Sequence, residues 1–100
     1  MTSYLGAIDA IGTDGEVLES VQASLGSTTS PHGQGWGGTF TLQKTARSPD
    51  WIRSAYGLRT PVTIRTTTGR TGEVLIHELW RSRFHPWQAE VIGIGSLPFD

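Results

Sequence analysis

The chain has 100 residues, of which 36% are hydrophobic and 17% charged, and its formal net charge is −1. This length fits one domain with a modest core, and the hydrophobic content excludes an intrinsically disordered chain. The near-neutral charge argues against a strongly basic nucleic-acid binder, and the absence of cysteine excludes disulfides and thiolate metal sites.

Apolar and polar side chains alternate along the first half of the chain, which is the pattern of strands with one buried face. The first three strands are expected at residues 4–11, 16–25 and 36–43. Asp14 and Gly15 lie between the first two strands, and an Asp-Gly pair in that position predicts a tight hairpin turn. Residues 26–35 are rich in Gly, Ser and Thr and are expected to form a mobile surface loop.

One short helix is expected between the third and fourth strands. Ser48 can cap its start, Pro49 suits its first position, and Asp50 favours the positive N-terminal end of a helix. Gly57 is expected to end it. Apolar side chains at helical spacing form a stripe that would plug one end of the sheet structure: Trp51, Ile52, Ala55 and Tyr56.

The second half of the chain predicts three more strands, at residues 60–66, 71–80 and 88–95. Six short strands favour an all-β fold, as a closed or nearly closed antiparallel barrel over residues 1–100, because closure removes exposed strand edges. A two-sheet sandwich is the alternative. Leu97, Pro98 and Phe99 are expected to fold back as an apolar plug. The first residues lack a signal-peptide pattern and no apolar run reaches about 18 residues, so a cytoplasmic protein without a membrane partner is expected.

Four short motifs are spread over most of the chain: Tyr4-Leu5-Gly6, Trp36-Gly37-Gly38, Val62-Thr63-Ile64-Arg65-Thr66, and Gly93-Ile94-Gly95-Ser96-Leu97-Pro98-Phe99. In these motifs the chain resembles a family of small, uncharacterised bacterial β domains, some of them fused to flavin-dependent monooxygenases. The middle loop and residues 80–87 depart from the family pattern. The resemblance implies a β fold and an accessory role beside an enzyme or a partner, and it carries over no catalytic residue.

Residues 80–87 are the strongest candidate binding segment, because Trp and Arg are enriched at interface hot spots. Its rings can form a docking surface or a pocket wall, or they can fold into the barrel end, and both alternatives stay open here. If residues 28–35 close over the same end, they would supply the other half of the site. The candidate binding side chains are Trp80, Arg81, Arg83, Phe84, His85 and Trp87.

Catalytic, metal and cofactor sites are not expected. His77 and Glu78 are adjacent in a predicted strand and would point to opposite faces, which argues against a shared metal ion with His32 or His85. Asp9 shares its side of the first strand with apolar residues. An inward carboxylate there would need an ion pair, with Arg65 or Arg59, more readily than it would serve catalysis.

Three functions follow, in order of preference. The first is a non-catalytic accessory domain that self-associates, for example as a dimer, or docks on a larger protein, through edge strands or residues 80–87. The second is a small-molecule-binding barrel with modest catalysis by confinement, which requires an apolar cavity of at least about 300 Å³ with a few convergent polar groups. The third is single-stranded nucleic-acid binding by Arg and aromatic side chains.

Overall fold

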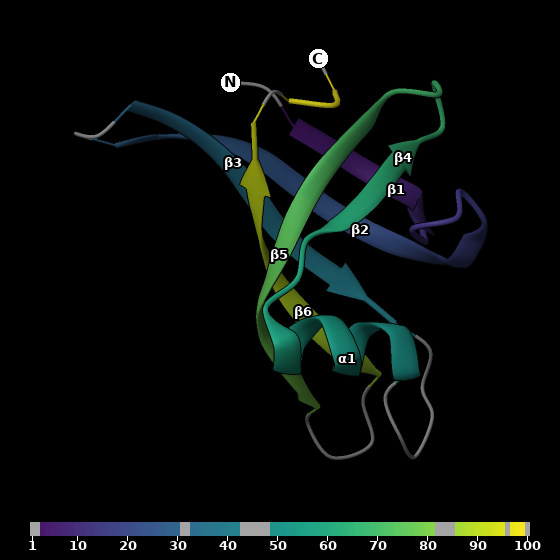
Figure 1. Ribbon diagram of the computed structural model, residues 1–100. Coiled ribbons are helices and arrows are strands. Elements are labelled where there is room, and N and C mark those ends of the chain that lie inside the picture. Colours follow the sequence, from purple (N-terminus) through teal and green to yellow (C-terminus); the bar gives the residue numbers. More distant parts are fainter. Residues whose placement is uncertain (1–2, 31–32, 43–48, 82–85, 96, 100) are drawn as a thin grey trace.

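The computed structural model describes residues 3–30, 33–42, 49–81, 86–95 and 97–99. They form a closed barrel in which the strands follow the order β1-β2-β3-β6-β5-β4 (Figure 1). All neighbouring strands are antiparallel. The closed barrel is confirmed over the sandwich alternative. The elements are β1 (Ser3–Ile11), β2 (Val17–Ser30), β3 (Gly33–Thr41), α1 (Asp50–Leu58), β4 (Val62–Thr66), β5 (Thr71–Arg81) and β6 (Trp87–Ile94).

The barrel interior is packed with side chains from alternate positions of the strands. Ile8, Phe40, Ile64 and Ile76 are each at most 1% exposed, so the centre of the barrel is a core and not a channel. Any ligand site must therefore lie outside this core. No helix in the described part of the chain is long and apolar enough to cross a bilayer.

The predicted surface loop at residues 26–35 is wrong, because β2 and β3 continue through it. Their pairing extends from Gly26 opposite Gly37 to Ser30 opposite Gly33, and Figure 1 shows this ribbon running away from the barrel. Backbone hydrogen bonds need no bulky side chains, and the β-branched Thr28 and Thr29 favour extended backbone. The abundance of Gly and Ser therefore misled the prediction.

One barrel end is closed by aromatic packing. The Trp36 indole is 4% exposed, its Nε1 donates to the Gly95 carbonyl at 3.0 Å, and its ring meets that of Phe99 edge-on at 6.0 Å. Tyr4 packs on the same Phe99 ring at 6.0 Å. A Cβ added to Gly93 would lie 2.1 Å from the Trp36 ring, so only glycine fits beneath it. The predicted plug is confirmed, since Pro98 and Phe99 are buried.

Helix α1 covers the other end of the barrel and buries Ile52 and Ala55 (Figure 1). Two predicted boundaries are wrong: Pro49 is the N-cap, not the first helical residue, and the helix continues past Gly57. The predicted cap Ser48 lies outside the described residues.

The helix ends at Leu58, and its C-cap residue Arg59 adopts the left-handed conformation with a φ of 54°. Its Nη1 donates to the carbonyls of Ile76 and His77 at 3.1 and 3.2 Å, and its guanidinium lies 4.9 Å from the centre of the Tyr56 ring. These contacts offset the cost of a positive φ at a residue with a side chain. They explain why the helix stops here and not at the glycine.

Candidate functional site

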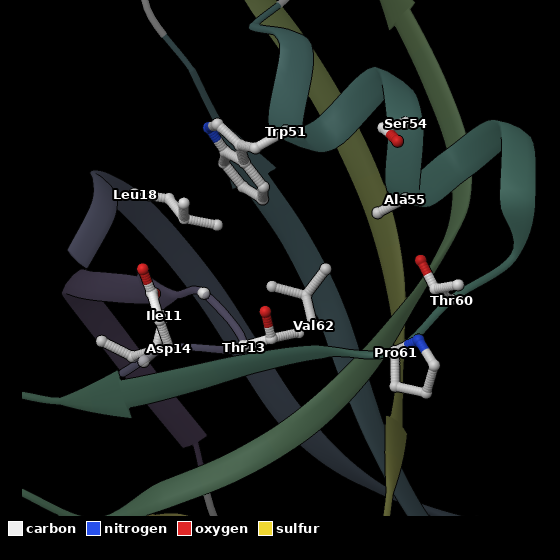
Figure 2. A pocket seen from close by; sticks show the side chains of 11 residues that line it. Ile11, Thr13, Asp14, Leu18, Trp51, Ser54, Ala55, Thr60, Pro61 and Val62 are labelled. Atoms are coloured by element: carbon white, nitrogen blue, oxygen red, sulfur yellow. The ribbon is translucent and has the colours of Figure 1, made fainter. Parts of the chain in front are cut away.

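A pocket of about 360 Å³ lies between α1 and the barrel mouth that it covers. Three segments that are distant in sequence form it: the turn between β1 and β2, the barrel-facing side of α1, and the entry into β4. Figure 2 shows Trp51 and Ala55 projecting from α1 and facing Val62 and Thr13 across the opening. This mouth pocket is lined by Ile11, Gly12, Thr13, Asp14, Leu18, Trp51, Ser54, Ala55, Thr60, Pro61 and Val62.

The helical repeat explains the upper wall of the mouth pocket. Trp51, Ser54 and Ala55 are spaced at i, i+3 and i+4, so they share one face of α1. Ala55 is 5% exposed and anchors this face on the barrel, while the small side chain of Ser54 leaves space beside it. The helix therefore covers this end of the barrel and leaves a pocket between the two.

The turn between β1 and β2 holds Asp14 at the rim. The Gly12 amide donates to the Glu16 carbonyl at 2.8 Å, and the Gly15 amide donates to the Gly12 carbonyl at 3.0 Å. Asp14 Oδ1 accepts from the Glu16 amide at 3.1 Å, which fixes the carboxylate through its own backbone turn. The predicted Asp14-Gly15 turn is confirmed, with Gly15 at a φ of 85°.

The walls of the mouth pocket combine an apolar surface with a few polar groups. Ile11, Leu18 and Val62 supply aliphatic surface from the barrel side. The polar groups are the Asp14 carboxylate and the hydroxyls of Thr13, Ser54 and Thr60. Such a pattern suits binding of a partly apolar molecule.

A hydrogen bond behind the pocket fixes the Trp51 ring. Trp51 Nε1 donates to Glu19 Oε1 at 3.2 Å, which joins α1 to β2. Glu19 Oε2 is buried, and it has no hydrogen-bond partner in the described structure. The ring nitrogen lies on the side away from Val62, so the carbon part of the indole borders the pocket (Figure 2).

No family model, curated protein or solved structure matches this chain. The chemistry of the site is therefore inferred from its own geometry. Within the residues that the structure describes, no three His, Asp or Glu side chains gather as metal ligands.

Of the predicted binding residues, the structure describes three. Trp80 and Arg81 end β5 and are exposed, whereas Trp87 begins β6 and is half-buried against the core. Because Trp80 pairs with Gln88 and Arg81 pairs with Trp87, the two tryptophans lie on opposite faces of the hairpin. The structure therefore does not bring them together as one surface. Arg83, Phe84 and His85 lie outside the described residues.

The expected closure of residues 28–35 over the same end is wrong. β3 pairs with β6 from Thr41 opposite Gln88 to Gly37 opposite Ile92. The β2–β3 ribbon therefore extends from the opposite end of β6, away from Trp87. Within the described chain, the closed part of the barrel has no edge strand, whereas the β2–β3 ribbon from Ser27 to Ser30 and from Gly33 to Trp36 pairs only with itself. A contact through strand edges stays a prediction.

Asp9 does not point into the barrel, because Ile8 and Ala10 fill that part of the interior. Asp9 faces outward, accepts from Ser20 Oγ at 2.5 Å and pairs with Arg65 Nη2 at 3.2 Å. The Ser20 hydrogen bond, and then the Arg65 guanidinium, lower the pKa of the Asp9 carboxyl below its usual value. The predicted ion pair with Arg65 is thus confirmed, whereas Arg59 is engaged elsewhere.

The strand alternation expected at His77 and Glu78 is interrupted by a register shift between Ile76 and Glu78, and both His77 and Glu78 are exposed. The other two histidines, His32 and His85, lie outside the described residues.

Sequence reasoning missed the mouth pocket. The pattern assigned Trp51 and Ala55 to a plug, and it gave Asp14 a role only in the turn. The available signal was the small, polar Ser54, which shares a helical face with Trp51 and Ala55 and is exposed beside them.

Proposed function

We propose that this chain is a small accessory domain that binds one largely apolar molecule with a polar end. The observation that carries the proposal is the mouth pocket, whose volume of about 360 Å³ exceeds the lower bound of about 300 Å³ expected for ligand sites. Its aliphatic walls suit an apolar body. Its carboxylate and hydroxyls suit a polar group at the rim.

The composition of the mouth pocket favours binding over catalysis. General acid–base or nucleophilic catalysis needs a nucleophile and a base within hydrogen-bond reach of each other. Asp14 accepts a hydrogen bond from the Glu16 amide at 3.1 Å, which stabilises the turn. Glu19 accepts one from the Trp51 indole at 3.2 Å, which holds the ring in place. Self-association, docking on a larger protein, nucleic-acid binding and the resemblance to bacterial β domains stay predictions.

The proposal is tested by filling the pocket from the helix. Ser54 lines the pocket and is exposed, so Ser54→Phe places a ring in the opening without changing the core. The probe is 1-hexanol, a neutral molecule with an apolar chain and one hydroxyl, and binding is followed by saturation-transfer NMR. We expect the wild-type protein to bind 1-hexanol and Ser54→Phe to lose that binding.

Ser24→Phe is the matched control, since Ser24 is exposed on the outer surface of β2 and does not line the pocket. It should bind 1-hexanol like the wild type. Equal binding by the Ser54 variant and the wild type, or no binding by the wild type, would overturn the proposal.

A further inference from the structure

We infer that the polar end of the ligand is a cation, so that the mouth pocket takes a small amphipathic amine. This inference rests on the proposed function and deepens it. It starts from the lining: among the described side chains that line the pocket, Asp14 alone carries a formal charge. A carboxylate at the rim of an apolar pocket favours a positive ligand and repels a negative one.

Trp51 provides the second feature that suits a cation. Its indole borders the pocket, and its N–H donates to the Glu19 carboxylate on the far side. A donor bound to an anion is polarised, which makes the ring more electron-rich. Electron-rich indoles attract ammonium groups more strongly than other aromatic side chains do. Glu19 Oε2, buried and without a partner in the described structure, adds negative potential behind the ring.

The described charges around the pocket have the same sign as Asp14, or are already engaged. Glu16 follows the turn, and Glu19 lies behind the indole. Of the described arginines near α1, Arg53 pairs with Asp50 and Arg59 is directed to backbone carbonyls of β5. Neither of them lines the pocket. The described charges near the opening therefore favour a cation.

The experiment compares three probes with the same chain and different ends: hexylammonium, 1-hexanol and hexanoate. Dissociation constants are measured by NMR titration at low ionic strength. We expect hexylammonium to bind about fivefold more tightly than 1-hexanol, because about fivefold is the largest effect that one solvent-exposed ion pair usually has on affinity. Hexanoate should bind more weakly than both. Added salt should reduce the preference for the amine.

Two variants assign the preference to the rim carboxylate. Asp14→Asn keeps an oxygen acceptor for the Glu16 amide but removes the charge. It should abolish the fivefold preference for hexylammonium, because it weakens binding of the amine more than binding of 1-hexanol. Glu16→Gln is the matched control, because Glu16 is exposed next to the turn but does not line the pocket. It should retain most of the preference.

The outcomes separate the two proposals. If 1-hexanol binds but the amine gains nothing over it, or Asp14→Asn keeps the preference, the inference of a cationic ligand fails and the proposed function stands. If the wild-type protein does not bind 1-hexanol, the proposed function itself fails, and the inference that rests on it fails as well. Amide chemical shifts outside the turn that match those of the wild type show that Asp14→Asn keeps the fold and the rest of the pocket.

Discussion

The two ends of the barrel are closed in different ways. At one end, Trp36 and Phe99 pack ring against ring, and Gly93 leaves no room for even one more carbon atom. At the other end, α1 lies over the mouth but leaves a pocket of about 360 Å³ beside Ser54. Both ends carry a tryptophan whose N–H is bonded, to a backbone carbonyl at the packed end and to a carboxylate at the open one.

This difference separates stability from binding. The tightly packed end gains dispersion and hydrophobic stabilisation from its rings, and pockets of about 420 and 340 Å³ border Trp36 and Phe99 there. At the end that α1 covers, incomplete packing gains less of that stabilisation. The space that remains is lined by both apolar and polar groups. Volume does not distinguish the two ends, so the proposal of ligand binding at the helix-covered end rests on its aliphatic walls and its rim of carboxylate and hydroxyl groups.

The largest expected effect comes from adding one methyl group at the packed end. Gly93→Ala places a Cβ where the Trp36 ring now lies, so the ring must move. Overpacking of this kind costs up to about 3 kcal/mol in the free energy of unfolding. Urea denaturation measures the loss, and near-ultraviolet circular dichroism should report a changed tryptophan environment.

The same substitution on the helix is the control. Gly57 lies in α1 with no atom within 4 Å of an added Cβ, so Gly57→Ala should raise the free energy of unfolding by about 0.5–1 kcal/mol. Equal changes for the two variants would contradict the contrast between the ends.

An intermediate effect is expected where the helix is attached to the barrel. Arg59→Ala removes two hydrogen bonds to β5 and the contact with Tyr56, while keeping a Cβ in a left-handed conformation. The free energy of unfolding should fall by about 1–2 kcal/mol. Arg59→Gly loses the same contacts but relieves the backbone, so it should be more stable than the alanine variant by about 1 kcal/mol. An alanine variant as stable as the wild type would show that these contacts do not hold the helix.

The smallest effect is expected on the outer barrel wall, at Asp9. Because the folded state lowers its pKa, ionised Asp9 stabilises the fold above its unfolded value of about 3.9, and this stabilisation is lost as the pH falls through the lowered value. Asp9→Asn should therefore be less stable at pH 7 and should lose less stability than the wild type between pH 5 and 2. Ser20→Ala should move the pKa of Asp9 back toward its ordinary value, as measured by carboxyl NMR titration. A pKa unaffected by that change would contradict the assigned cause.

The sequence predicts the barrel better than the pocket. Alternation and turn residues report local backbone geometry, so the six strands, the Asp14-Gly15 turn and the helix were all predictable. The predicted ends of the helix and strands were wrong where tertiary contacts determine them. Arg59 ends α1 through contacts with β5, and β2–β3 pairing overrides the Gly-rich composition of residues 26–35.

The mouth pocket could not be predicted because no local pattern reports an absence of packing. Asp14, Trp51 and Val62 belong to three separate segments, and only barrel closure brings them together. The segment of residues 80–87 attracted attention by composition alone. The pairing register places Trp80 and Trp87 on opposite faces of the β5–β6 hairpin, and strand alternation in the sequence does not give that register.

Amide chemical-shift mapping with hexylammonium tests the central claim most directly, because it locates the bound molecule on the barrel. We predict that the shifts concentrate on residues 11–18 and 51–62, around the mouth pocket, and that the amides of Trp36, Gly95 and Phe99 stay unchanged. Shifts centred on the packed end, or on Trp80 and Trp87, would contradict the assignment of binding to the helix-covered end.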